Sequence, residues 1–297
     1  MKPRLRAELA LAVVTVIWGS TFVLVKSALA EISTFLFLTL RFAVAALALF
    51  AIYRGSLKRN GILPGIFAGC LLFAAYVFQT LGLELTTPSK SAFLTGLSIP
   101  MVPLASSLVY RVRPRLPEVL GILTATFGMA LMTLPPGRFE ISHGDFLSFL
   151  CAVVFALHIV VVSHYSSPAT GQESGFRTVA VLQVATAAAL GLGSLFLFEP
   201  VRFHPTPRVA IAVLITGLFA TALAFTTMAW AQQYTTATRS ALIFSLEPVV
   251  AWFTSWALTG ESLALRGQLG AALILAGVLM VELRFGGNET VGGSTAS

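Results

Sequence analysis

The stretch Thr235–Glu261, TTATRSALIFSLEPVVAWFTSWALTGE, decides how this chain is organised. It predicts a membrane-spanning helix that carries a carboxylate, Glu247, near its middle and directly before Pro248. A related stretch, TTPSKSAFLTGL, occurs 149 positions earlier at Thr86–Leu97. The same offset, without a gap, relates later glycines to earlier ones: Gly270 to Gly121, and Gly277 to Gly128. Because a constant offset over this length indicates a duplication, the chain is predicted to contain two copies of one unit.

The composition is that of a chain that lies in a membrane. Hydrophobic residues make up 57% of the 297 residues and charged residues only 10%, whereas soluble domains carry about 25% charged residues. Apolar runs of about 20 residues, which can cross a bilayer as a helix, follow one another along the chain. We therefore expect an all-α membrane protein with ten transmembrane helices, at roughly residues 8–28, 33–53, 62–82, 90–110, 117–134, 144–164, 175–198, 208–231, 238–258 and 266–284.

The cationic residues predict the orientation of these helices. With a cytoplasmic N-terminus, only Lys26 and Lys90 of the first half fall on the outside, as the positive-inside rule requires. Five helices per copy is an odd number, so the second copy is expected to be inverted. Accordingly, the loop after the fourth helix carries three arginines at positions 111–115, and the loop after the ninth carries none. We expect an inner-membrane protein with both termini cytoplasmic, repeats at residues 1–138 and 139–285, and a disordered cytoplasmic tail at 286–297.

Several motifs resemble the EamA-type branch of the drug/metabolite transporter superfamily. They are Trp18-Gly19-Ser20-Thr21-Phe22, Arg41-Phe42, Leu246-Glu247-Pro248-Val249, Gly260-Glu261 and the glycine-spaced segment from Gly267 to Gly277. The resemblance covers nearly the whole chain and implies a ten-helix permease, commonly an exporter of amino acids or related metabolites, with a cavity between its halves. The family's motifs are shared by members with different substrates. One departure is His158, which follows Phe155-Ala156 where the family more often has a plain aromatic residue.

Aromatic and polar residues within the apolar runs are the candidates for a substrate cavity. Pockets usually combine apolar walls with a few orienting polar groups. His158 is of special interest because an imidazole can carry a proton near neutral pH, although a neutral, hydrogen-bonded histidine is an equally simple interpretation. The candidate substrate-binding residues are Trp18, Tyr76, Gln79, Phe155, His158, Gln183, Phe225 and Trp230.

Two charged residues, Glu247 and Arg41, lie about ten residues into their predicted helices and so near the bilayer centre. A charge at that depth costs about 2.5–3.5 kcal/mol on insertion scales and usually faces a cavity or a partner. One hypothesis makes Glu247 a carboxylate that responds to a proton or substrate. The other makes the two residues a structural ion pair between the second and ninth helices.

Lys90 and Arg239 occupy the first turns of the fourth and ninth helices, on opposite membrane faces. A cation there opposes the helix dipole. Each is therefore a candidate gate that attracts an anion, or else a side chain that extends to the lipid headgroups. Three prolines, Pro100, Pro103 and Pro248, remove helical hydrogen bonds and are candidate hinges, or simple kinks.

The remaining expectations concern partners and cofactors. Glycines seven residues apart in the fifth and tenth helices permit close helix contact and suggest a homodimer contact through these two helices. Cys70 and Cys151 have no ligand-like spacing, so no metal or cofactor is expected. The partners expected are a small-molecule substrate and the lipid bilayer, and the net charge of +7 is attributed to membrane orientation rather than to nucleic-acid binding.

Inverted repeats are a recurrent feature of secondary transporters whose site lies near the midplane. The sequence therefore predicts a secondary transporter, an exporter of small metabolites such as amino acids, that works by alternating access, either proton-coupled or facilitated. A membrane sensor or scaffold without transport is the alternative. An embedded enzyme is disfavoured because His, Asp and Glu do not cluster along the chain.

Overall fold

The computed structural model describes residues 3–86, 88–111, 113–134, 142–166, 175–198, 200–259 and 264–285. In these residues the regular structure is helical, apart from one isolated bridge between Ile32 and Phe203. Seven helical segments are long and apolar enough to cross a membrane. The prediction of an all-helical, multi-pass membrane protein is therefore confirmed. The repeat boundary at 138/139, Gly260-Glu261 and the tail 286–297 lie outside the described residues.

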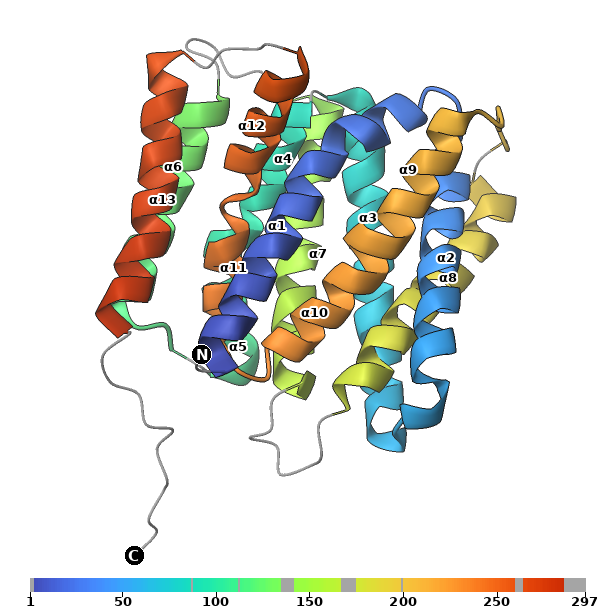
Figure 1. Cartoon of the computed structure of the whole chain (residues 1–297), viewed down its shortest axis with the longest axis horizontal. Helices are drawn as coiled ribbons and strands as arrows, with labels where there is room; N and C mark the ends of the chain where they lie inside the picture. The colour runs from blue at the N-terminus through green and yellow to red at the C-terminus, as the bar shows by residue number, and fades with distance from the viewer. Residues whose placement is uncertain are drawn as a thin grey trace, which may run out of the picture.

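The helices of the first half are α1 (Pro3–Ala28), α2 (Thr34–Tyr53), two short 3-10 turns (Arg54–Ser56 and Arg59–Gly61), α3 (Ile62–Leu85), α4 (Pro88–Gly96), α5 (Ser98–Tyr110) and α6 (Leu116–Thr133). Those of the second half are α7 (His143–Ser166), α8 (Phe176–Phe198), α9 (Pro207–Gly217), the π-helical segment η4 (Leu218–Leu223), α10 (Ala224–Ala231), α11 (Ala237–Phe244), α12 (Glu247–Thr259) and α13 (Leu265–Phe285). The first residues of α1 and the last of α13 lie at the same end of the molecule, hereafter the lower end (Figure 1).

Two of the expected spans, 90–110 and 238–258, were predicted as continuous helices, but each is divided into two helices. The fourth is divided into α4 and α5 at Leu97, and the ninth into α11 and α12 at Ser245 and Leu246. The proline after each break explains its place. Pro100 has no N–H to donate to the carbonyl of Gly96, and Pro248 has none for Phe244, which are the last residues of α4 and α11. Leu97 and Leu246 are 149 positions apart, so the breaks occupy corresponding places in the two predicted copies.

Pro103 differs from these two prolines because it lies inside α5 rather than at a break. Of the three candidate hinges, only Pro100 and Pro248 thus lie close to a break between two helices. Their role as hinges stays a prediction.

The fifth and tenth predicted helices, α6 and α13, pack against each other along one side of the bundle (Figure 1). A Cβ added to Gly128 would lie 2.6 Å from the carbonyl oxygen of Gly270, and one added to Gly277 would lie 2.6 Å from that of Gly121. The glycines identified in the sequence therefore serve a contact within one chain. A homodimer through these helices stays a prediction.

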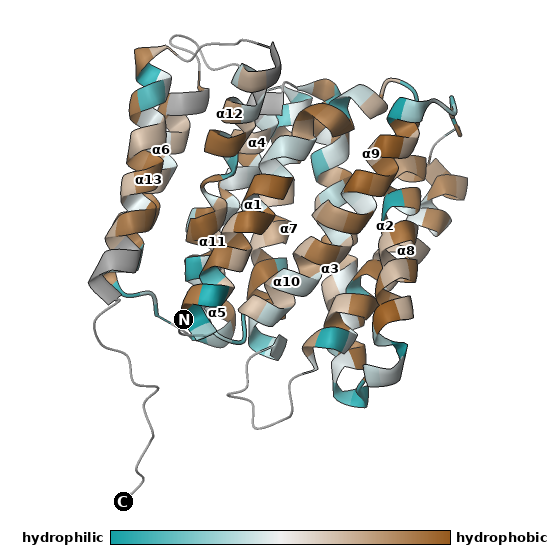
Figure 2. Ribbon diagram, in the orientation of Figure 1, coloured by the Kyte–Doolittle hydropathy of each residue, from teal (hydrophilic) through white to brown (hydrophobic). Residues whose placement is uncertain are grey.

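The outer surface of the helices is apolar, as contact with lipid requires (Figure 2). Large side chains such as Leu63, Leu108 and Phe196 are 76%, 86% and 79% exposed. Hydrophilic residues lie mainly toward the helix ends in Figure 2. At the upper end the segment after α1 is joined to the segment before α9 by the bridge, and to the first turn of α9 by a 2.9 Å ion pair between Arg208 Nη1 and Glu31 Oε1.

Candidate functional site

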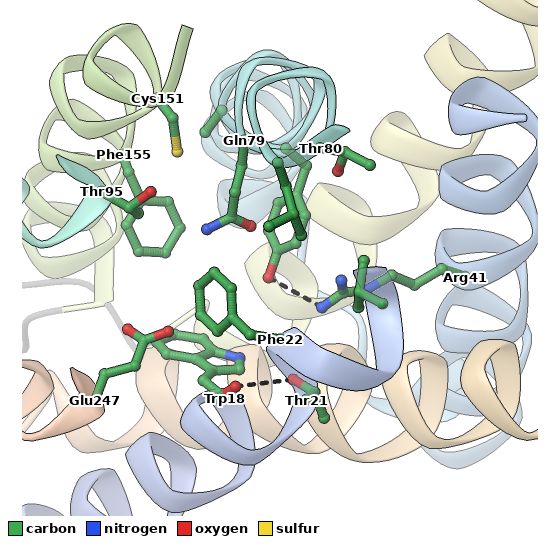
Figure 3. Close-up of a pocket in the computed structure, with 14 residues that line it drawn as sticks. Trp18, Thr21, Phe22, Arg41, Gln79, Thr80, Thr95, Cys151, Phe155 and Glu247 are labelled. Carbon is green, nitrogen blue, oxygen red and sulfur yellow. Dashed lines mark hydrogen bonds between the residues drawn. The ribbon is translucent and has the colours of Figure 1, made fainter. Parts of the chain in front are cut away.

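A cavity lies in the bundle between α1, α2, α3, α4, α7 and α12 (Figure 3). Its volume is about 40 Å³, which is room for a few water molecules, whereas ligand pockets usually occupy about 300–1,000 Å³. It extends along α1 from Trp18 to Val25 and along α3 from Ala75 to Leu83, and so toward the upper end of both helices. The cavity must therefore widen before it can accept a metabolite.

The π-helical segment η4 anchors one wall of this cavity. The carbonyl oxygen of Ala220 accepts a 2.8 Å hydrogen bond from Nε1 of Trp18 and a 3.3 Å bond from Nη2 of Arg41. A π-helical turn does not follow the regular α-helical hydrogen-bond pattern, and such turns are frequent at functional sites. One carbonyl thus positions two cavity residues that come from different helices, α1 and α2.

Arg41 is buried and is held by neutral groups. Its Nε donates to Thr221 Oγ1 at 2.7 Å, and its Nη2 donates to Tyr76 Oη at 3.1 Å. The guanidinium also lies over the Tyr76 ring, 4.4 Å from the centroid. These contacts fix the arginine against η4 and leave Nη1 without a hydrogen bond to any described residue.

Replacing Arg41 with lysine is expected to lower the free energy of unfolding by about 1–3 kcal/mol, because an ammonium group cannot serve acceptors on several sides as a guanidinium does. Tyr76→Phe, which removes one of these contacts, is expected to cost about 1 kcal/mol. Both effects can be measured by tryptophan fluorescence during unfolding of the protein in detergent. An Arg41→Lys variant as stable as the wild type would contradict the importance of this anchor.

The direct ion pair hypothesised between Glu247 and Arg41 is not formed. Both side chains line the cavity, but they lie on opposite sides of it in Figure 3, and no salt bridge joins them among the described residues. Arg41 instead bonds to Tyr76, Thr221 and Ala220. The sequence left open whether each charge faces a cavity or a partner; in the structure both line the cavity, which separates them (Figure 3).

The sequence-based substrate candidates divide into two groups. Trp18, Tyr76, Gln79 and Phe155 line the cavity, whereas His158, Gln183, Phe225 and Trp230 do not. His158 is fully buried behind the wall, where its Nε2 lies 2.9 Å from Gln183 Oε1. Its ring stacks on that of Phe155 at 5.6 Å and meets Phe225 edge-on. The neutral, hydrogen-bonded interpretation of His158 therefore fits its surroundings.

Phe225 and Trp230 support neighbouring rings instead of facing the cavity. Phe225 is completely buried, with its ring 5.5 Å from Trp18 and 6.1 Å from Tyr76. It therefore supports the cavity wall from behind. Trp230 packs edge-on against Tyr234 at 5.5 Å.

Other cavity residues were missed by the sequence analysis. They are Thr21, Phe22 and Val25 of α1, Ala75, Thr80 and Leu83 of α3, Thr95 of α4 and Cys151 of α7. The first two belong to the motif that begins at Trp18, so the motif itself was a usable signal. Apart from Cys151, one of two cysteines, the others are apolar or small residues of kinds that are common throughout the chain, and only the packing of the helices distinguishes them.

Arg239, a candidate gate, forms a buried ionic cluster at the lower end. It is 4% exposed, and its guanidinium lies 3.7 Å from Glu8 Oε1 and 3.6 Å from Glu118 Oε1. Arg4 completes the cluster through a 2.7 Å contact with Glu8. Arg239 therefore neither extends to the headgroups nor leaves an open anion site. Instead it joins α11 to α1 and α6, and we call these four residues the lower latch.

A related contact occurs at the opposite, upper end. Thr86 Oγ1 donates to Asp145 Oδ1 at 2.6 Å, just as Thr235 Oγ1 donates to Glu8 Oε1 at 3.3 Å. Thr86 and Thr235 are 149 positions apart, and Glu8 and Asp145 are 137 apart, the same spacing as Trp18 and Phe155. Lys90, which corresponds to Arg239, belongs to the first turn of α4, but its side chain lies outside the described part of the structure.

The absence of a side chain at Gly19 lets the break in the ninth span pack closely against α1. A Cβ at this position would lie 2.8 Å from the carbonyl oxygen of Glu247 and 2.9 Å from Cβ of Val250. Only a residue without a side chain permits this approach. Because Gly19 directly follows Trp18, the approach brings the Glu247 backbone to the turn of α1 that carries the indole.

Comparisons with known proteins agree with this fold. A transporter of Archaeoglobus fulgidus, described as uncharacterized, is 35% identical over 282 residues, which cover 95% of this chain and 87% of the relative. The uncharacterized transporter YoaV of Bacillus subtilis is 24% identical over 285 residues, which make up 92% of this chain and 95% of YoaV. A protein of known crystal structure has the same fold, with a TM-score of 0.77, 20% identity and coverage of 94% and 97% of the two chains. The EamA-like transporter family matches residues 5–134 and again residues 142–283. With a family match over most of its length and relatives that are transporters, the chain belongs to the EamA-like transporter family and is a multi-pass membrane transporter.

Proposed function

We propose that this protein is a secondary transporter that exports small metabolites such as amino acids across the cytoplasmic membrane by alternating access. The observation that carries the proposal is the cavity between two broken spans. Thr95 lines it next to the end of α4, and Glu247 lines it as the first residue of α12. Broken helices that meet near the midplane are typical of transporter substrate sites, because they bring polar groups and flexible backbone to the same place.

The proposed topology is ten spans in two inverted repeats, at residues 1–138 and 139–285. The two matches to the same family, at 5–134 and 142–283, support two copies. The corresponding breaks at Leu97 and Leu246 support it as well. The arginine- and lysine-rich loops of the first half favour a cytoplasmic lower end, so that both termini are cytoplasmic.

In this topology the described conformation is closed toward the cytoplasm. The lower latch joins α1, α6 and α11 at the cytoplasmic end, and the cavity extends from Trp18 toward the opposite end. Transport requires a second state, in which the latch is open and the cavity is closed toward the upper end. The breaks beside Pro100 and Pro248 are the places where the helices can bend between the two states.

Counterflow and uptake in proteoliposomes test this proposal directly. We expect saturable flux for at least one member of a panel of labelled amino acids and nucleosides. Flux that persists without a pH gradient would indicate a facilitator, and flux that requires the gradient would indicate proton coupling. The negative control is the Gly128→Leu variant, in which the larger side chain prevents the close packing of α6 against α13. If the wild type carries no member of the panel in either direction, the proposed cargo class is wrong and a sensor or scaffold is favoured.

A further inference from the structure

Glu247 presents an uncompensated carboxylate to the cavity. It is the first residue of α12 and lines the cavity. Within the described part of the chain its side chain has neither a hydrogen bond nor an ion pair. A carboxylate in an apolar surrounding is costly unless it is paired or hydrogen-bonded. The cavity therefore contains an acidic group whose charged form a cationic ligand would stabilise.

The wall around Glu247 is aromatic. Trp18, Phe22 and Phe155 line the same cavity, and the rings of Trp18 and Phe155 meet edge-on with centroids 6.0 Å apart. In Figure 3 the carboxylate points toward the Trp18 indole. The indole N–H is already bonded to Ala220, so the indole has no donor left for an anion. Aromatic faces next to a carboxylate favour an organic cation, because the π-system and the charge attract it together.

The opposite side of the cavity carries the positive charge. Arg41 is 4% exposed, and its hydrogen-bond partners, Tyr76, Thr221 and the carbonyl of Ala220, are all uncharged. A cavity with separated positive and negative sides orients its ligand. A group of three or more metal-ligating residues does not occur among the described residues, so the lone carboxylate is a poor metal site.

We propose that Glu247, with the rings of Trp18 and Phe155, forms a subsite for a protonated primary amine of the cargo. This subsite rests on the proposed transport function and names the feature of the substrate that it recognises. The amine binds at Glu247, and acceptor atoms of the substrate face Arg41. Glu247 is therefore a specificity-determining residue rather than one half of a structural ion pair.

Binding of three phenyl compounds to the purified full-length protein in detergent tests the subsite. Phenethylamine carries only an amine, 3-phenylpropanol is neutral, and 3-phenylpropionate carries only a carboxylate. We expect the wild type to bind phenethylamine more tightly than 3-phenylpropanol. Glu247→Gln is expected to weaken phenethylamine binding about 10- to 100-fold and to leave 3-phenylpropanol binding unchanged, since it removes a charge-assisted contact that only the amine makes.

The matched control is Glu84→Gln, which makes the same substitution at an exposed carboxylate of α3 that bonds to Thr34 at 2.7 Å. It should bind phenethylamine like the wild type. If Glu247→Gln does not fold, Glu247→Asp provides the second variant, which keeps the charge but withdraws it from the rings and is expected to weaken amine binding by a smaller factor. Equal binding of the amine and the alcohol by the wild type, no binding of any of the three compounds, or unchanged amine affinity in Glu247→Gln would each overturn the subsite.

The binding assay and the flux assay separate the two proposals. Amine-selective binding that depends on Glu247, without flux of any member of the panel, would leave the subsite intact and refute the proposed export of these cargoes. Flux of a cargo whose Michaelis constant is unchanged by Glu247→Gln would support transport and refute the subsite. A change in maximal flux alone, with unchanged amine affinity, would place Glu247 in a step after binding and also refute the subsite.

Discussion

Arg239→Met is expected to lower the free energy of unfolding by about 3–5 kcal/mol, the usual cost of removing one partner of a buried ion pair. Methionine has a similar length but no charge, so Glu8 and Glu118 would face the vacated space without their shared cation. Both carboxylates are nearly buried, at 8% and 6% exposure, and water cannot readily compensate for the loss. The measurement is unfolding of the detergent-solubilised protein, followed by tryptophan fluorescence.

Two further variants identify the cause of the loss. Adding Glu118→Gln to Arg239→Met should recover part of the stability, because it removes the negative charge of Glu118, whereas Glu8 keeps its pair with Arg4. Arg208→Met is the exposed control: Arg208 also pairs with a glutamate, Glu31, but is 59% exposed, so its loss should cost less than about 1 kcal/mol. Similar losses for Arg208→Met and Arg239→Met, or no recovery in the double variant, would show that the lower latch contributes little.

Gly128→Ala is expected to lower the free energy of unfolding by about 1–3 kcal/mol, as overpacking of a close contact does. The new methyl group would lie 2.6 Å from the carbonyl oxygen of Gly270. This neighbour is backbone and cannot rotate away, so α6 and α13 must separate. Gly277→Ala should have a similar effect, because the added atom would meet the carbonyl oxygen of Gly121 at the same distance.

Gly193→Ala is the matched control for these variants. Gly193 also lies within a long helix, α8, but a Cβ there would meet nothing within 4 Å. The same substitution should then be neutral or stabilising, by up to about 1 kcal/mol from the higher helix propensity of alanine. If Gly128→Ala proved as stable as Gly193→Ala, the two helices would not be in the close contact described here.

Part of the site could be predicted from the sequence because charged residues, tryptophans and tyrosines are few in this chain, which has four Trp and five Tyr. Glu247, Arg41, Trp18 and Tyr76 were identified for this reason, and all four line the cavity. His158 and Gln183 were equally conspicuous, but they bond to each other at 2.9 Å behind the wall. Polarity within a span indicates that a side chain needs a partner, and it does not show whether that partner is another residue or a ligand.

The sequence by itself determined the helical, membrane-spanning character of this protein, its duplication and its family, because hydropathy, a constant offset and local motifs are properties of the chain alone. Only the tertiary structure decided which residues meet. It separated Arg41 from Glu247, joined Arg239 to Glu8 and Glu118, and made the carbonyl of Ala220 an anchor for Trp18 and Arg41. These contacts connect residues as many as 231 positions apart. They depend on the rotation and close approach of packed helices, which local sequence patterns do not encode.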